Sequence, residues 1–249
     1  MNNKKGSHVG MMISFTMFIT FIVFIYAIIQ PVTKADQGKE AIVNYIERKL
    51  VENISSNLTI ISVRIGANPA SNCVNFSDLF MLSEASPSFD RVIVKNSTQQ
   101  IQTAYYSDSP NQAADLNVDR ASNTDTVFKI YLSNEFDEVA IPTGACEDLD
   151  HITEYNITSV SKSNNYIFEN KINDLNATYH AAYNQLKQDL GIPETQDFGF
   201  VFKRSDNTNI TAMPNYIERT SIAVKDIPVQ YVSDETAYVG LGFISIRVW

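Results

Sequence analysis

The residues of this chain that could perform catalysis are few and scattered. Three histidines occur, His8, His151 and His180. The sequence contains none of the motifs H-E-x-x-H, G-x-S-x-G, G-x-x-x-x-G-K or G-x-G-x-x-G, which mark zinc proteases, serine hydrolases, phosphate-binding loops and dinucleotide-binding folds. We therefore expect no catalytic residue, no cofactor and no enzymatic activity.

One acidic segment has the residue types that could bind a divalent cation. Glu147, Asp148, Asp150 and His151 combine carboxylate oxygens with an imidazole in the sequence EDLDH. Their spacing matches no metal-binding loop, so a solvated acidic loop is the better interpretation. A metal-assisted hydrolase built on these four residues is the least favoured function.

A second acidic segment begins like a calcium-binding loop. Asp115, Asn117 and Asp119 occupy alternate positions, but Arg120 stands where the loop needs glycine and Thr126 stands where it needs a bidentate glutamate. We therefore predict no metal site here.

The cysteines and the glycosylation sequons both point to a location outside the cytoplasm. Cys73 and Cys146 are the only cysteines, and we predict that they form a disulfide; two buried free thiols are the alternative. Seven Asn-x-Ser/Thr sequons, which are candidate N-glycosylation sites, begin at Asn53, Asn57, Asn75, Asn96, Asn156, Asn176 and Asn209.

The charge of the chain argues against nucleic-acid binding. All 28 acidic residues lie beyond Ala35, together with 16 of the 19 basic residues, which gives this part a net charge of −12. Affinity for nucleic acid depends on neutralising phosphates with basic side chains. We expect no nucleic-acid partner.

The segment from Met11 to Ile29 has no charged residue and is long enough to span a bilayer. Lys4 and Lys5 precede it without opposing acidic residues, so the positive-inside rule places the N-terminus in the cytoplasm and the C-terminal domain outside. The alternative is a secretory signal cleaved after Ala35, although such signals usually have a shorter apolar run.

Helical periodicity continues beyond the proline that follows this segment. Ile42, Ile46, Leu50 and Ile54 recur every four residues and form an apolar stripe. The pattern predicts one helical rod over 8–54, which is suited to lipid in its first half and to packing along one side in its second.

The remaining sequence predicts a β-rich domain with one packed helix. Ile172, Leu175, Tyr179, Ala182, Leu186 and Leu190 form a helical stripe that Gly191 and Pro193 end. The clearest strands are expected at 58–65, 91–96, 101–107, 126–133, 197–204, 220–232 and 236–249. The fold class is therefore α+β, with a leader at 1–6, a transmembrane helix at 7–30, an amphipathic stalk helix at 31–55 and a head domain at 56–249.

The first 55 residues resemble an archaeal type IV pilin-like protein with a class III signal sequence. The resemblance rests on the short basic leader MNNKKG, on Gly6 followed by Ser7, on the apolar span, and on the proline and amphipathic helix beyond it. It implies cleavage between Gly6 and Ser7 on the cytoplasmic side, which leaves the span attached. The sequence departs from the family at the fifth mature position, where Met11 replaces a frequent glutamate.

Two functions follow from these observations. The first is a single-pass, outward-facing pilin-like or minor pilin subunit of the cell membrane, which assembles with itself or with other pilin-like subunits through its N-terminal helix. The second is a membrane-anchored adhesin or sensor whose head binds a glycan or a protein, with the stem as a spacer. Neither function requires catalysis.

Overall fold

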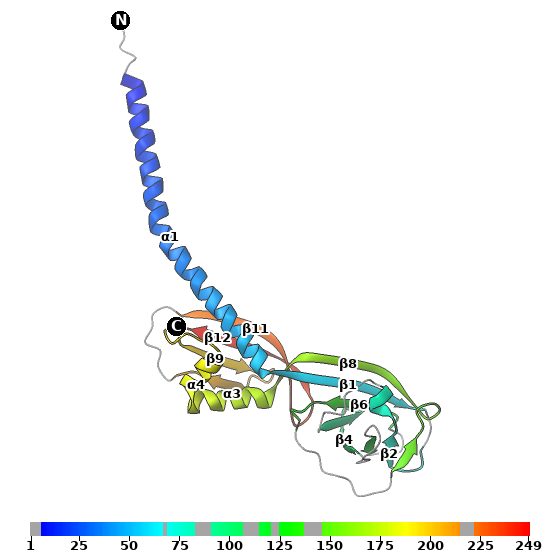
Figure 1. The fold of residues 1–249 in the computed structure, drawn as a ribbon. Coiled ribbons are helices and arrows are strands. Elements are labelled where there is room, and N and C mark those ends of the chain that lie inside the picture. The colour runs from blue at the N-terminus through cyan, green and yellow to red at the C-terminus, as the bar shows by residue number, and fades with distance from the viewer. Residues whose placement is uncertain are drawn as a thin grey trace.

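The computed structural model describes residues 6–66, 69–82, 91–106, 115–120, 125–136, 146–214 and 222–249. A single helix of 49 residues, α1 (Gly6–Ile54), extends from a β-rich head and leads directly into its first strand (Figure 1). The described strands are β1 (Ser55–Ile65), β2 (Cys73–Phe76), β3 (Val92–Asn96), β4 (Ile101–Tyr106), β5 (Leu116–Asp119), β6 (Val127–Leu132), β7 (Glu147–Leu149), β8 (Tyr155–Phe168), β9 (Phe198–Lys203), β10 (Asn209–Ala212), β11 (Ala223–Val232) and β12 (Val239–Val248). The α+β class predicted from the sequence is confirmed.

Within the described ranges, the strands form one sheet in the order β10-β9-β12-β11-β8-β1-β6-β3-β4-β5-β2-β7. Most neighbours are antiparallel, whereas β8 with β11 and β2 with β7 are parallel pairs. Strands β1 and β8 pair over ten positions and run from the end of α1 along the distal part of the head (Figure 1).

The head has two lobes, each with its own apolar core. The proximal lobe packs α1, α3 (Glu169–Ala181) and α4 (Tyr183–Asp189) on one face of β9 to β12. The distal lobe encloses a core between β1 to β6, the short helix α2 (Leu79–Leu82) and Leu149. A third cluster lies at the joint between the lobes and contains Leu58, Ile93, Tyr131, Phe136, Phe168, Val232 and Ala237.

The predicted strands follow the alternation of apolar residues. In β12, Ile244, Ile246 and Val248 are buried while Ser245 and Arg247 are half-buried, as the sequence predicts. Pro228 lies in β11, which pairs with β12 throughout but with β8 only at Tyr231 and Val232. Pro228, which has no backbone N–H to donate, therefore lies where one side of its strand pairs with no described strand.

A turn around Asp206 connects β9 to β10. Asp206 accepts hydrogen bonds from the backbone N and the hydroxyl of Thr208, at 2.8 and 2.6 Å, and these bonds lower the pKa of Asp206. Asn207 has φ 66°, a conformation that asparagine tolerates better than most residues.

The helix predicted over 172–190 is present, but a break at Ala182 divides it into two helices. That residue has φ −146° and ψ 50°, which separates α3 from α4. Periodicity does not reveal the break because the apolar residues on both sides of it keep helical spacing. Gly191 ends α4 in the left-handed conformation, with φ 66°, as the sequence predicts.

Several elements were not predicted, and the longest of them is β8. This strand has 14 residues, and its segment from Thr158 to Lys162 is exposed throughout. A strand that buries neither face has no period-two pattern, so the sequence gives no strand signal there. Strands β2, β5, β7 and β10 have four residues or fewer and were missed for lack of length.

Candidate functional site

The N-terminal half of α1 is the most unusual surface of the molecule. The segment Gly10–Ile28 is long and apolar enough to cross a membrane, and none of it is buried against the rest of the chain. Met11 is 75% exposed and Phe15 is 65% exposed, which would be costly in water. This helix is the one candidate membrane span within the described residues.

The polar residues of this segment are compatible with lipid. The Thr16 hydroxyl donates to the Met12 carbonyl at 2.9 Å, and the Thr20 hydroxyl donates to the Thr16 carbonyl at 2.8 Å. These bonds satisfy both donors within the helix, so neither needs water. Both threonines line a shallow open groove along one side of the helix, formed by Met12, Ile13, Thr16, Met17, Thr20, Phe21 and Phe24.

The C-terminal half of α1 belongs to the core of the proximal lobe. Ile46, Leu50 and Ile54 are at most 1% exposed and pack with α3, α4 and the sheet. Three of the four predicted stripe residues are therefore buried as expected. Ile42 is only partly buried at the rim of the core, and Val43 beside it is buried.

Polar contacts fix the stem to the head beside this apolar stripe. On β11, Lys225 Nζ lies 2.5 Å from Glu47 Oε2 and 2.7 Å from Asn44 Oδ1. On the other side, the Tyr45 hydroxyl donates to the Leu190 carbonyl at 3.3 Å. The sequence alone did not single out these residues, since they stand at the polar positions of an amphipathic helix.

Further polar contacts fix the two lobes to each other. Glu135, which follows β6, accepts a hydrogen bond from the Ser56 hydroxyl at 2.9 Å and lies 3.3 Å from Lys171 Nζ on α3. Across the joint, the buried Lys95 Nζ donates to the Ala237 carbonyl at 3.2 Å. Burial and the nearby Lys129 lower the pKa of Lys95. Stem, proximal lobe and distal lobe are thus connected by polar contacts, of which the one made by Lys95 is buried.

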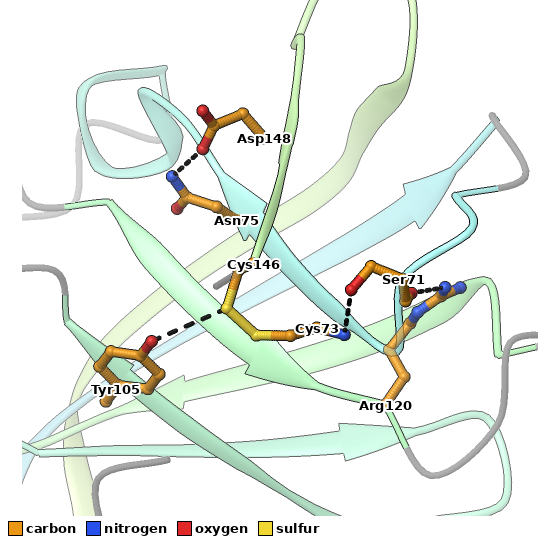
Figure 2. Close-up of a disulfide and its surroundings, with 7 residues drawn as sticks. All are labelled: Ser71, Cys73, Asn75, Tyr105, Arg120, Cys146 and Asp148. Atoms are coloured by element: carbon orange, nitrogen blue, oxygen red, sulfur yellow. Dashed lines mark hydrogen bonds between the residues drawn. A yellow bond between two sulfur atoms is a disulfide. The ribbon is translucent and has the colours of Figure 1, made fainter. Parts of the chain in front are cut away.

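The predicted disulfide is present in the distal lobe, between Cys73 and Cys146. It joins the start of β2 to the residue before β7, and these two strands are also neighbours in the sheet (Figure 2). Asn75 Nδ2 donates to Asp148 Oδ1 at 2.8 Å across the same strands. The Tyr105 hydroxyl lies 3.7 Å from the Cys146 sulfur. Both cysteines are used structurally and offer no thiol.

The carboxylates near the disulfide make local hydrogen bonds. Glu147 Oε2 accepts from the Ser71 backbone N at 3.0 Å, and Asp150 Oδ1 accepts from the Ile152 backbone N at 2.8 Å. His151 Nδ1 lies 3.8 Å from Asp78 Oδ2. Within the described part of the chain, no group of three or more His, Cys, Asp or Glu side chains could hold a metal ion.

The calcium-loop candidate lies on an extended strand. Asn117 is buried and Asp119 is exposed within β5, and Asp115 Oδ1 accepts a hydrogen bond from the Asp78 backbone N at 3.1 Å. An extended strand does not curl around an ion as a binding loop does. Of the remaining histidines, His180 is exposed on α3, and the side chain of His8 lies outside the described residues.

The predicted glycosylation sequons differ greatly in exposure. Asn53, Asn57, Asn156 and Asn209 are exposed, and Asn176 is half-buried. Asn75 and Asn96 are 9% and 3% exposed, and their Nδ2 atoms donate to Asp148 and Asp125 at 2.8 and 3.2 Å. The fold leaves no room for a glycan on these two amides, so they are poor acceptor sites.

The predicted processing site lies at the very start of the described chain. Helix α1 begins at Gly6, and the basic leader before it and the side chains around Ser7 lie outside the described residues. Comparison of the chain with protein-family models, with curated proteins and with solved structures finds no match.

Proposed function

We propose that this chain is a pilin-like or minor pilin structural subunit, held in the cell membrane by the first half of α1 with its head outside. The observation that carries the proposal is the division of one continuous helix into two parts. Gly10–Ile28 is apolar and buried nowhere in the molecule, whereas Ile46, Leu50 and Ile54 form part of the head core. The exposed half has apolar surface for lipid and for neighbouring helices.

This division makes the stem a rigid part of the subunit. One stripe of the C-terminal half of α1 is buried in the head, and Glu47 and Tyr45 on this half bind Lys225 and Leu190 of the head. The direction of the helix is therefore set by the head. Packing of spans would therefore arrange the heads in a regular way, as a structural subunit requires. A flexible tether would not transmit that order.

The first test is the N-terminus of the mature protein isolated from its own membranes. Intact mass and terminal sequencing should give Ser7, which a prepilin peptidase would produce. A start at Met1 would leave an ordinary anchored domain and count against the pilin-like assignment. A start at Asp36 would mean a secreted protein and overturn both the anchor and the assembly.

The second test asks whether the spans lie against each other. The native cysteines form a disulfide, so Thr20→Cys introduces a single free thiol on the groove of the span. Mild oxidation in membranes should give cross-linked dimers, and the same variant diluted in detergent micelles is the control. The same experiment is repeated with a single cysteine at each of the three residues that follow Thr20. If all four variants give only monomer in membranes, assembly through the stem is contradicted.

The packing of α1 also determines how the alternative function, a ligand-binding head on a spacer, has to be tested. A fragment that starts near Asn57 would lack Ile46, Leu50 and Ile54 and would leave the proximal core open. Ligand screens should therefore use the full chain in detergent. Specific binding by a chain that does not assemble would favour the adhesin or sensor.

A further inference from the structure

Strands β8 and β10 each have an edge that pairs with no described strand, as do the terminal strand β7 and the first residues of β11. Residues Tyr155–Tyr166 of β8 lie beside β1 on one side, and only Ile167 and Phe168 also pair with β11. The terminal strand β10 pairs with β9 alone. Figure 1 shows β8 along the outer margin of the distal lobe. Open edges of this kind can pair with strands of other molecules.

Strands β8 and β10 each begin with a glycosylation sequon. Asn156 is the second residue of β8, and Asn209 is the first residue of β10. At both sites the asparagine and the threonine two residues later, Thr158 and Thr211, are exposed. Both side chains that a glycosyltransferase must reach are therefore accessible in the folded head.

The other sequons lack this combination. Asn53 and Asn57 are exposed, but the Ser55 hydroxyl is buried without a partner and Thr59 is 5% exposed. Asn176 has a buried side-chain oxygen on α3. The remaining two, Asn75 and Asn96, are buried. The two sequons in which both side chains are accessible thus both lie on strands with an open edge.

We propose that Asn156 and Asn209 carry N-linked glycans, and that these glycans shield the open edges of β8 and β10 against pairing with neighbouring heads. The acceptor atom is the side-chain Nδ2, and the donor is an oligosaccharide activated by a phosphate or pyrophosphate leaving group. A bond forms between Nδ2 and the anomeric carbon, and the bond from that carbon to the phosphate oxygen breaks. The amide loses one proton and the phosphate leaves.

The structure already protects one of these edges in part. The register of β1 and β8 shifts between Ser62 and Val63, opposite Thr158, and such a bulge interrupts regular pairing. The stretch from Ser159 to Lys162 remains regular and exposed. A bulky hydrated oligosaccharide at Asn156 lies at the start of this strand, where it would block the approach of another strand. The inference depends on the outward location of the head in the proposed function.

The test is a glycopeptide analysis by mass spectrometry of the protein isolated from its own membranes. We expect glycan mass at Asn156 and Asn209, with Asn75 and Asn96 unmodified. Unmodified Asn156 and Asn209 would overturn the proposal, as would a glycan on Asn75 or Asn96. Protease treatment of intact cells is run in parallel. A cleavable head without these glycans refutes this inference alone, whereas a protected, unmodified head refutes the outward location as well.

The shielding role has its own test. The double variant Asn156→Gln with Asn209→Gln removes both sequons, and the double variant Thr158→Ser with Thr211→Ser keeps both as a matched control. Sedimentation in detergent should show self-association at several-fold lower concentration for the first variant, with an unchanged melting temperature, and no change for the second. Equal self-association of the two variants would overturn the shielding role.

Discussion

At the scale of single residues, the attachment of the stem depends on a few close contacts. Gly191 has φ 66°, and a Cβ built on it would lie 2.6 Å from the Tyr45 hydroxyl oxygen on α1. The glycine therefore ends α4 and at the same time leaves space for the stem. Its two roles explain why this position needs a residue without a side chain.

We predict that Gly191→Ala lowers the free energy of unfolding by about 1–3 kcal/mol, because the left-handed conformation and the close contact with Tyr45 both penalise a Cβ. Urea unfolding of the detergent-solubilised chain, followed by the fluorescence of its single tryptophan, Trp249, measures the change. The control is Gly66→Ala, since a Cβ there meets only the Glu154 carbonyl at 3.8 Å. Equal stability of the two variants would contradict the prediction.

The proximal lobe should lose stability in alkali through its buried tyrosines. Burial and the charge of Asp197 raise the pKa of Tyr179 from 10.0 to about 12, so the unfolded chain loses this proton more easily than the folded chain. The stabilisation is complete below pH 10 and disappears as the pH rises towards 12. Urea midpoints measured by circular dichroism should fall across this window.

Substitution of this tyrosine tests the cause of the alkaline loss. Tyr179→Phe removes the hydrogen bond to the Phe198 carbonyl, at 2.9 Å, and should cost about 1 kcal/mol at pH 8. Its urea midpoint should then fall less steeply above pH 10 than that of the unchanged protein. Tyr238→Phe alters an exposed tyrosine and is the control. A slope in Tyr179→Phe equal to that of the control would disprove the assignment.

At the scale of elements, the two halves of α1 lie in different environments. Residues in its first half are exposed, and the stripe in its second half is as deeply buried as any part of the sheet. The helix continues without interruption through Pro31. This agrees with the helical periodicity that the sequence shows beyond the proline. The second half of α1 therefore folds together with the head.

Two matched isoleucine substitutions separate these environments. Ile46→Ala should lower the free energy of unfolding of the head by about 2–5 kcal/mol, because Ile46 is fully buried and the change leaves a cavity. Ile28→Ala, at a position that is 56% exposed, should leave head stability unchanged. Urea unfolding reported by Trp249 checks both variants. A large loss of stability in Ile28→Ala would show that the apolar first half of α1 also packs on the head.

At the scale of the whole molecule, the head is two cores joined by long strands. The disulfide lies in the distal lobe and closes a sequence separation of 73 residues, whereas α1 packs on the proximal lobe. Contacts of Glu135, Lys95 and the joint cluster connect the lobes. The two lobes should therefore differ in local stability. Because these contacts connect them, unfolding of one lobe should still destabilise the other.

Loss of the disulfide should act on the distal lobe first. The double variant Cys73→Ser with Cys146→Ser should cost about 2–5 kcal/mol, since the unfolded chain regains the freedom of a long loop. Hydrogen exchange should accelerate in β2, β5 and β7 while β9 and β12 stay protected. Equal acceleration in both lobes would show that the joint makes the head a single cooperative unit.

The sequence by itself determined the elements whose signals are local. The long apolar helix, the apolar stripe at Ile46, Leu50 and Ile54, the alternation in β12 and the turn at Asp206 each follow from the hydrophobicity or conformational preference of adjacent residues. The sequence also predicts the disulfide correctly, because with two cysteines only one pairing is possible. These signals require no knowledge of distant parts of the chain.

Only the tertiary structure decided how these elements meet. Strand β8 shows no periodicity because it is exposed, and its existence depends on hydrogen bonds to β1, roughly 100 residues away in the chain. The division into two lobes, the contact of Tyr45 with Gly191, and the burial of Asn75 and Asn96 likewise depend on residues far apart in sequence. Non-local contacts leave no periodic trace in the residues that make them, so the sequence could name the candidate sequons but not which of them are accessible.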